Sequence, residues 1–351
     1  MERRQRLEGA RRSPAAGPVR AAEVSSIPGA RKGAVPGSVT PQLATLAVSP
    51  PRGADWLHEI KFDGYRMLAR LAAGRIQLMT RNGNDWTDKF PAIVAALAGM
   101  GVRSAFFDGE IVHLGENGAS SFSALQADLS ENRSDRLTYF IFDLLALDGY
   151  ILTGCRLDDR KRILQAVIAG APQRAIRYSD HIAGNGPDFL AKACAASLEG
   201  IVSKRRDEPY LPGRSGAWLK FKCSGREEFV VIGWTEPMGS RQFLGALLLG
   251  YYDADGMLHY AGRVGTGFTE RTLRDLHGRL APLERFASPL TAAAGIPHRT
   301  HWVEPELVAE IRFAEWTRDR RLRQPSFLGL REDKTARQVV LDPRAGTALP
   351  P

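Results

Sequence analysis

The sequence predicts an α+β protein built from two domains. Up to about residue 225, strand patterns and helix patterns alternate irregularly, which argues for a mixed α+β domain and against a regular doubly wound sheet. Beyond that point strand patterns dominate and one segment has helical periodicity. The chain has 351 residues, of which 44% are hydrophobic and 25% charged, and this ordinary globular composition leaves room for about two domains. We place the first domain at residues 39–225 and the second at residues 226–345.

A disordered basic tail is expected before the first domain, at residues 1–38. This segment is rich in Ala, Gly, Pro, Ser and Arg and shows no hydrophobic periodicity, so it lacks the apolar surface that folding requires. Residues 1–40 hold eight basic and three acidic side chains, which supply more than half of the formal net charge of +9. A polyanionic partner suits such an arm, and a plainly solvated tail explains the composition equally well.

Strands and helices of the first domain follow from local patterns. A hairpin is expected from Tyr65–Ala72 and Ile76–Arg81 around Gly74-Arg75. Thr87 is expected to cap a helix with Pro91 in its first turn and with an apolar face formed by Phe90, Ile93, Val94 and Leu97. Further strands are expected at Ser104–Leu114, Leu137–Leu145, Gly200–Lys204 and Ala217–Cys223. Further helices are expected at Ser120–Leu129, Asp158–Ile168 and Pro187–Ala196.

The second domain is expected to be a small barrel. Its strands are predicted at Phe229–Trp234, Leu244–Tyr252, Met257–Val264 and Val308–Trp316, and its helix at Glu270–Leu280. Several strands with one helix in a domain of this size are typical of an OB-fold, which is the leading candidate.

Cysteines and apolar runs bound the class of protein. Cys155, Cys194 and Cys223 are odd in number and far apart, which predicts a reducing compartment with no disulfide framework and no zinc site. No apolar run is long enough to span a membrane, and the Arg-rich start lacks the apolar core of a signal peptide. We therefore expect a cytoplasmic protein.

One lysine, Lys61, stands inside the apolar, strand-like run Trp56–Phe62. Burial would remove water from the ammonium group and lower its pKa, and the neighbouring Arg66 would act in the same direction. A neutral amine is a nucleophile, whereas an ammonium ion is not. Asp63-Gly64 then turns the chain so that Arg66 returns toward the same site. Taken alone, the stretch is explained as well by a strand whose lysine extends into water.

Five further motifs follow Lys61-Phe62-Asp63-Gly64 in a fixed order. They are Arg81-Asn82-Gly83, Asp108-Gly109-Glu110, Phe140-Ile141-Phe142-Asp143, Glu199-Gly200-Ile201-Val202-Ser203-Lys204 and Trp218-Leu219-Lys220-Phe221-Lys222. Each motif is short, so the information lies in their order. The series resembles the covalent nucleotidyltransferase superfamily of ATP-dependent DNA ligases, RNA ligases and capping enzymes.

Longer segments narrow the resemblance to the ligase domain of bacterial ligase D, the end-joining ligase that works with Ku. The resemblance covers roughly residues 38 to 342 and is carried by the following segments: Pro41–Leu46, His58–Arg66, Tyr210–Ser215 and Pro325–Lys334. It implies a nucleotidyltransferase (adenylation, ATP-grasp-like) domain followed by an OB-fold β-barrel domain.

The resemblance also implies which residues bind ATP. Lys61 would attack the α-phosphate and hold AMP covalently. Glu59 would accept from the exocyclic amine of adenine, and Phe142 would stack on the base. Arg66 and Arg81 would contact ribose or phosphate. Seen in isolation, Glu59 is also explained as an exposed strand residue and Phe142 as plain core.

Charged residues complete the implied site. Mg²⁺ or Mn²⁺ would be held by Glu110 and Glu199, because carboxylates are hard oxygen ligands. The pyrophosphate leaving group would be oriented by Arg331 and Lys334 of the second domain, which requires that domain to close. The triphosphate would be neutralised by three strand lysines, Lys204, Lys220 and Lys222, although a surface strand edge also explains this alternation.

The implied function is that of an ATP-dependent DNA ligase, which seals 5′-phosphate and 3′-hydroxyl ends in duplex DNA during repair by end joining. An RNA ligase, a capping-type nucleotidyltransferase and a non-catalytic nucleic-acid-binding scaffold remain alternatives. The expected partner is nicked or broken duplex DNA, and the protein is expected to be a monomer. Ku and separate polymerase and phosphoesterase chains are candidate partners, because 351 residues leave no room for those modules.

Overall fold

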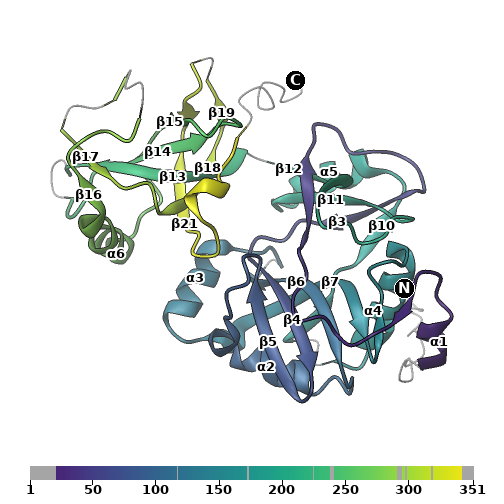
Figure 1. Cartoon of the computed structure of the whole chain (residues 1–351). Coiled ribbons are helices and arrows are strands. Elements are labelled where there is room, and N and C mark those ends of the chain that lie inside the picture. The colour runs from purple at the N-terminus through teal and green to yellow at the C-terminus, as the bar shows by residue number, and fades with distance from the viewer. Residues whose placement is uncertain are drawn as a thin grey trace, which may run out of the picture.

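The computed structural model describes residues 21–341, apart from residues 117, 172–173, 224, 238–240, 291–294, 297–298 and 318. The described chain forms two domains, and Figure 1 shows the second domain, which contains α6 and β13, beside and above the first. The chain passes from one to the other between β12 (Gly213–Lys222) and β13 (Gly225–Thr235).

The larger sheet of the first domain has the strand order β1-β8-β7-β6-β4-β5, with β9 added parallel to β7. In that order the strands are β1 (Arg31–Lys32), β8 (Tyr150–Ile151), β7 (Leu137–Leu147), β6 (Ala105–His113), β4 (Tyr65–Ala72), β5 (Arg75–Thr80) and β9 (Ile176–Tyr178). One face packs its apolar side chains against α2 (Pro91–Ala98) and α4 (Leu157–Ile168) and forms the main core. The opposite face is turned toward the second sheet.

The smaller sheet has the order β10-β3-β11-β12-β2. Its strands are β10 (His181–Ala183), β3 (Trp56–Ile60), β11 (Gly200–Arg205), β12 and β2 (Gln42–Leu46). Helix α5 (Gly186–Ala195) packs on β11 through a small apolar cluster around Ile201 and Phe221. Since Phe106 and Leu145 of the larger sheet pack against Trp218 of β12, the two sheets face each other across the domain.

The second domain is organised around β13. This long strand bonds to β14 (Leu247–Tyr252) on one edge and to β17 (Thr300–Val303) and β18 (Val308–Phe313) on the other. The remaining elements are β15 (Leu258–Val264), α6 (Glu270–Leu280), β16 (Glu284–Arg285), β19 (Glu315–Trp316), β20 (Leu322–Arg323) and β21 (Ser326–Leu330). One strand that serves two successive partners lets the sheet curl over its own core, as a small barrel requires.

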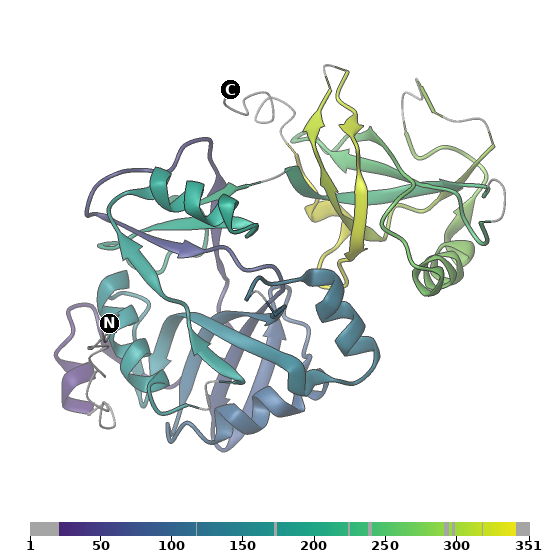
Figure 2. The ribbon, with the colours of Figure 1, turned by 180° about the vertical axis from the view of Figure 1, so that it is seen from behind.

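The two domains meet where α3 (Phe122–Ser130) of the first lies beside β21 of the second. The views from the front and from behind agree on this contact (Figures 1 and 2). The helix begins at Ser121, whose hydroxyl accepts from the backbone N–H of Ala124.

The expected disordered tail is wrong for residues 21–38. Helix α1 (Ala21–Ser25) and strand β1 lie on the first domain, where β1 pairs with β8. Val24 and Ile27 are 2% and 5% exposed and belong to the main core. The sequence shows no hydrophobic periodicity around Val24 and Ile27, because separate tertiary contacts bury each of them. Residues 1–20 lie outside the described residues.

Local patterns predicted the longer helices and strands closely, but not the short strands β9, β10 and β17. The expected strand Val308–Trp316 is divided into β18 and β19, and a further difference lies at Thr87. The expected hairpin forms, with Ala73 and Gly74 at φ 51° and 74° in the turn. Thr87 does not cap α2. Its hydroxyl accepts from the N–H of Leu78, and it begins a 3₁₀ turn, so that Pro91 opens the helix instead.

Cys194 and Cys223 form a disulfide, which corrects the expectation that the cysteines are unpaired. Cys194 lies in α5 and Cys223 follows the last residue of β12, and their Cα atoms are 5.1 Å apart. Their separation of 29 residues in the sequence hides this, because α5 packs on the sheet that contains β12. Among the described helices, none is long and apolar enough to cross a membrane.

Candidate active site

A cavity of about 180 Å³ lies where both sheets of the first domain meet the second domain. Nine residues predicted from the sequence line it, namely Lys61, Arg66, Arg81, Glu110, Glu199, Lys220, Lys222, Arg331 and Lys334. They come from segments spread between residues 61 and 334, so the fold brings together residues that the motif series only placed in order.

Strand pairing places Lys61 beside Glu199. Strand β3 runs antiparallel to β11, and the backbone N–H of Lys61 donates to the carbonyl of Gly200 at 2.9 Å. The Lys61 Nζ therefore lies 2.6 Å from Glu199 Oε2. Gly200 has φ 155°, and a Cβ there would lie 1.9 Å from the carbonyl oxygen of Phe221, so only glycine permits this approach.

The prediction that Lys61 has a lowered pKa is wrong in this arrangement. Burial does lower the pKa of the amine, but the carboxylates of Glu199 and Glu110 raise it by more. The side chain of Lys61 is 23% exposed and that of Glu199 is 4% exposed, so water screens the pair weakly. Lys61 is thus stored as an ammonium ion, and a deprotonation step must precede any nucleophilic attack.

Arg66 is held by residues that lie in the predicted motifs but to which the sequence assigned no role of their own. It forms two bonds to Asp108, at 2.9 and 2.5 Å, and donates to the carbonyl of Gln42 at 2.7 Å. Asp108 is fully buried and also accepts from the Tyr210 hydroxyl at 2.7 Å. Since the β4–β6 register sets Arg66 opposite Glu110, this network orients the arginine beside that carboxylate in the cavity wall.

Two lysines on β12 reach the cavity together. Lys220 and Lys222 alternate with Phe221, so both point to one face while Phe221 enters the core, as the period of two predicted. Burial and the neighbouring Lys222 lower the pKa of Lys220 to about 7. Burial raises the pKa of Glu110 to about 8. An anion or a cation that binds in this cavity can therefore change the protonation of Lys220 and Glu110.

Glu59, Phe142 and Lys204 do not line the cavity but form a separate cluster, in which Glu59 and Lys204 are buried and Phe142 is half-buried. Glu59 Oε1 accepts from Lys161 at 2.8 Å and lies 2.9 Å from the Nζ of Lys204, and Oε2 accepts from Ser179 at 2.7 Å. The Lys204 Nζ lies 4.4 Å from the centre of the Phe142 ring. Glu59 is 2% exposed, which excludes its reading as an exposed strand residue.

Charge, not burial, decides the protonation of Glu59. Burial raises the pKa of this carboxyl, but Lys161 and Lys204 lower it by more, to about 2. Lys161 was missed from the sequence because α4 reads as an ordinary amphipathic helix, on whose buried face this lysine stands.

Arg331 and Lys334 bring the second domain into the cavity. Arg331 lies 2.8 Å from Asp333 and 3.2 Å from Glu310, and its guanidinium stands 4.7 Å from the centre of the Phe122 ring of α3. Lys334 forms an ion pair with Glu228 of β13. The structure thus holds the second domain closed against the first.

Arg226 of β13 links the two domains through its side chain. It donates to Asp63 at 2.6 Å and to Glu310 at 2.8 Å. Asp63 belongs to the first domain and follows Lys61 by two positions, whereas Glu310 also contacts Arg331. No periodic signal in the sequence marks Arg226, because its two partners are distant in the chain.

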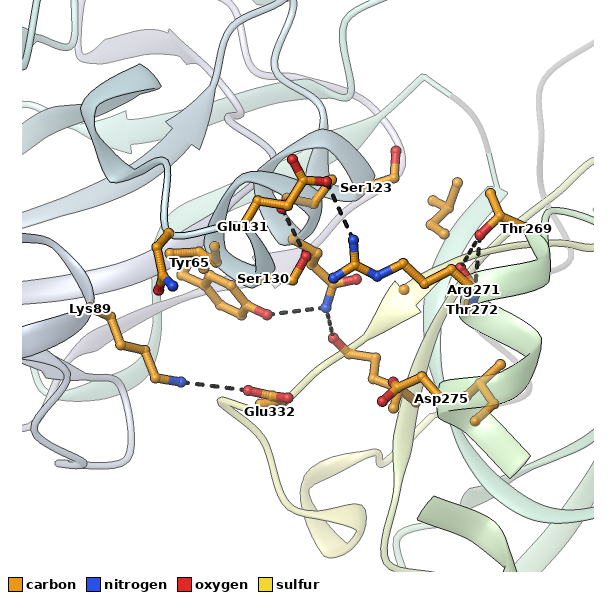
Figure 3. A pocket seen from close by; sticks show the side chains of 18 of the residues that line it. Tyr65, Lys89, Ser123, Ser130, Glu131, Thr269, Arg271, Thr272, Asp275 and Glu332 are labelled. Atoms are coloured by element: carbon orange, nitrogen blue, oxygen red, sulfur yellow. Dashed lines mark hydrogen bonds and ion pairs between the residues drawn. The ribbon is translucent and has the colours of Figure 1, made fainter. Parts of the chain in front are cut away.

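A larger cleft of about 690 Å³ lies between the same two domains and is not lined by Lys61. Tyr65, Ser130 and Glu131 of the first domain face Thr269, Arg271 and Asp275 of the second across it (Figure 3). Over the described residues, no three His, Cys, Asp or Glu side chains gather to hold a metal by themselves.

Comparison with protein families assigns both domains. The family described as ATP dependent DNA ligase domain matches residues 41–222, and the ATP dependent DNA ligase C terminal region matches residues 240–334. A structure of mycobacterial DNA ligase D complexed with ATP and MES is 35% identical, with a TM-score of 0.65 over 86% of this chain and 98% of that one. The predicted nucleotidyltransferase domain followed by an OB-fold domain is therefore confirmed.

Curated relatives agree with this assignment. The multifunctional non-homologous end joining protein LigD of Pseudomonas aeruginosa is 42% identical over 316 residues, which is 89% of this chain and 38% of that protein. The protein of the same name from Mycolicibacterium smegmatis is 38% identical over 319 residues, 88% of this chain and 40% of that protein. The chain thus spans about two fifths of the length of these relatives. It belongs to the family of ATP-dependent DNA ligases.

Proposed function

We propose that this ligase works through a covalent lysyl-AMP at Lys61. The amine attacks the α-phosphorus of ATP, a P–N bond forms, and the P–O bond to pyrophosphate breaks. AMP then passes to the 5′-phosphate of a DNA break, which releases the lysine. The 3′-hydroxyl attacks that phosphate, and AMP leaves. The observation that carries this proposal is the position of Lys61 in a cavity lined by cations from both domains.

Glu199 is the group best placed to prepare Lys61. At 2.6 Å it is within hydrogen-bond distance of the Nζ, and it belongs to the strand connection that positions the lysine backbone. We propose that it orients the amine and receives its proton when the nucleotide enters.

The nucleotide is proposed to lie between the two sheets. Glu59 and Phe142 would read adenine, since Glu59 is ionised and therefore acts only as an acceptor. Arg66 and Arg81 would contact ribose and phosphate from the cavity wall. The triphosphate would be neutralised by the following cations: Lys204, Lys220, Lys222, Arg331 and Lys334.

The donor set fits a divalent cation that arrives with the nucleotide. Glu110 and Glu199 both line the cavity, and Mg²⁺ is commonly bound by one or two carboxylates together with substrate phosphates. We propose these two carboxylates as its protein ligands, with Mg²⁺ or Mn²⁺ as the metal. When bound, the metal would polarise the phosphate oxygens.

The proposed substrate is nicked or broken duplex DNA in repair by end joining. The end-joining names of the relatives support this, although the chain matches only part of each. Ku and separate polymerase and phosphoesterase chains are the proposed partners, and the proposed oligomeric state is a monomer. Sealing of a nicked duplex and of a two-ended duplex, with and without Ku, tests the substrate, and a nicked RNA duplex in the same assay tests the RNA alternative.

Lys61→Ala tests the chemistry. We expect the variant to gain no covalent AMP from radiolabelled ATP and to seal no ordinary nick, while it keeps some sealing of a pre-adenylated nick, which bypasses the first step. Covalent AMP on the variant at the wild-type level, located elsewhere by mass spectrometry, would rule out Lys61 as the nucleophile.

A further inference from the structure

We propose that Gln126 of α3 is a positioning residue for the adenylation step, because it holds the backbone next to Arg331 when the second domain closes. Gly329 is its counterpart, since only a residue without a side chain leaves room for Gln126. This inference rests on the proposed function, in which Arg331 acts on the pyrophosphate of the first step alone.

The contact crosses the domain boundary. The Nε2 of Gln126 donates to the carbonyl of Leu330, the last residue of β21, and lies 3.2 Å from the hydroxyl of Tyr65. Tyr65 is 2% exposed and Leu330 is 7% exposed, so the amide bridges two buried positions. It is a neutral hydrogen bond to backbone, and it therefore keeps its strength when salt screens the surrounding charges.

Arg331 follows Leu330 directly, so the position of Arg331 depends on the hydrogen bond between Gln126 and the Leu330 carbonyl. Its guanidinium stands 4.7 Å from the centre of the Phe122 ring and 5.6 Å from that of Tyr65. Phe122 lies one helical turn before Gln126, so the residue that holds the Leu330 carbonyl and the ring under Arg331 belong to one face of α3. Docking β21 on this face places the arginine in the cavity that contains Lys61.

Gly329 shows how close the docking is. A Cβ added there would lie 1.8 Å from Gln126 Oε1, 2.7 Å from its Cδ and 3.2 Å from Cε1 of Phe122. All three atoms belong to the first domain. The φ of Gly329 lies outside the left-handed region, so its own strand tolerates alanine. A methyl group at this position would force the Gln126 side chain to shift from its bond to Leu330, without straining the fold of the second domain.

Two ion pairs at this boundary are more exposed than the Gln126 contact. Lys89 lies 3.6 Å from Glu332, and Arg271 lies 3.4 Å from Glu131, with at least 37% of each of these four side chains exposed. Exposed ion pairs contribute little to stability. Figure 3 shows these pairs along the rim of the larger cleft. Arg271→Ala is therefore a matched control, because it removes a contact between the same two domains and leaves the residues that position Arg331 unchanged.

The test compares two rates in four variants: Gln126→Ala, Gly329→Ala, the double variant, and Arg271→Ala. The first rate is the formation of covalent AMP, and the second is the sealing of a pre-adenylated nick. Loss of one half-buried hydrogen bond, with its acceptor left unpaired, should make the adenylation rate of Gln126→Ala about tenfold slower. Sealing of the pre-adenylated nick and the rates of Arg271→Ala should stay within about twofold of wild type.

The double variant provides the decisive comparison. Gly329→Ala alone should slow adenylation more than Gln126→Ala, because the new methyl group meets the glutamine side chain. Shortening the glutamine removes that clash, so the double variant should adenylate faster than Gly329→Ala. Thermal unfolding midpoints should match wild type in all four variants, which separates closure from folding.

Three results would overturn the inference: a wild-type adenylation rate in Gln126→Ala, equal losses in both rates, or a double variant that is no faster than Gly329→Ala. Failure of the proposed function is separate, because the wild-type protein itself would then gain no covalent AMP.

Discussion

At the scale of single residues, the proposed nucleophile Lys61 forms half of an ion pair. The distance of 2.6 Å between Lys61 and Glu199 keeps the amine protonated until something competes for the carboxylate. A metal ion or a phosphate that enters the cavity would change that balance. The same residue that inactivates the lysine at rest is thus positioned to activate it when the nucleotide binds.

Glu59 gives a pH dependence of stability with a definite sign. Its folded pKa is lowered from 4.5 to about 2, so its contribution is fully present above about pH 4.5 and is lost as the pH falls toward 2. Glu59→Gln leaves Lys161 and Lys204 without their carboxylate, which should cost about 3 kcal/mol of unfolding free energy at pH 6. The exposed Glu116→Gln serves as a control and should have little effect. Urea unfolding at several pH values should show the gap between wild type and Glu59→Gln narrowing below pH 4.5; a constant gap would contradict the assignment.

Lys334 is expected to matter for the first step of the reaction only. It enters the cavity from the second domain, and its proposed partner, pyrophosphate, exists only during adenylation. Lys334→Ala should therefore slow self-adenylation about tenfold or more and leave the sealing of a pre-adenylated nick nearly unchanged. Both rates are measured with the same preparation. Equal losses would indicate a role in folding or DNA binding.

At the scale of elements, strand order explains why the site works as a unit. In the smaller sheet, β11 lies between β3 and β12. The lysines of three separate motifs, which are Lys61, Lys204 and the pair Lys220 and Lys222, therefore lie on or directly next to neighbouring strands. Behind them, a fully buried ion pair between Asp143 of β7 and Arg160 of α4 fixes the strand that carries Phe142. Arg66, Glu110, Lys220 and Lys222 therefore stand within strands, whereas Lys61 and Glu199 lie directly next to the ends of β3 and β11.

The disulfide between α5 and the end of β12 predicts a measurable thiol count. In non-reducing, denaturing conditions, mass spectrometry after alkylation should find one free thiol, that of Cys155, and three after reduction. Because the bond closes a loop of about 30 residues, Cys223→Ser should lower the unfolding free energy by about 3 kcal/mol. Cys155→Ser is the control for thiol counting. Three free thiols without reductant would show that the two cysteines do not pair in solution.

At the scale of the whole molecule, the second domain covers the cavity that we propose for the nucleotide. Arg331 and Lys334 reach across the boundary, and Arg226 ties Asp63 to Glu310 behind them. This closed arrangement leaves the cavity small, so we expect that the domains separate before a DNA duplex reaches Lys61.

The first twenty residues are predicted to strengthen DNA binding. They hold six arginines and two glutamates, and phosphate neutralisation by such an arm releases counterions. Deleting residues 1–20 should leave self-adenylation unchanged, weaken nick binding at low salt, and flatten the slope of log affinity against log salt. Unchanged affinity and slope would make this segment a solvated tail. The deletion must stop before Val24 and Ile27, which are core residues, and removal of residues 1–38 should destabilise the first domain.

Much of the fold and most of the candidate site could be predicted from the sequence. The helix Glu270–Leu280 was predicted to the residue, and the alternation of Lys220 and Lys222 placed both on the cavity face. Periodicity and motif order are properties of the chain itself, because backbone geometry repeats every two or 3.6 residues whatever the rest of the molecule does.

Only the tertiary structure decided the properties that depend on residues meeting from distant parts of the chain. Glu199 reverses the direction of the Lys61 pKa from 138 positions away, and Gln126 meets the Leu330 carbonyl across 204. The pairing of Cys194 with Cys223 and the burial of Val24 have the same origin. Electrostatic and packing energies fall off over a few ångströms in space, and separation along the sequence carries no measure of that distance.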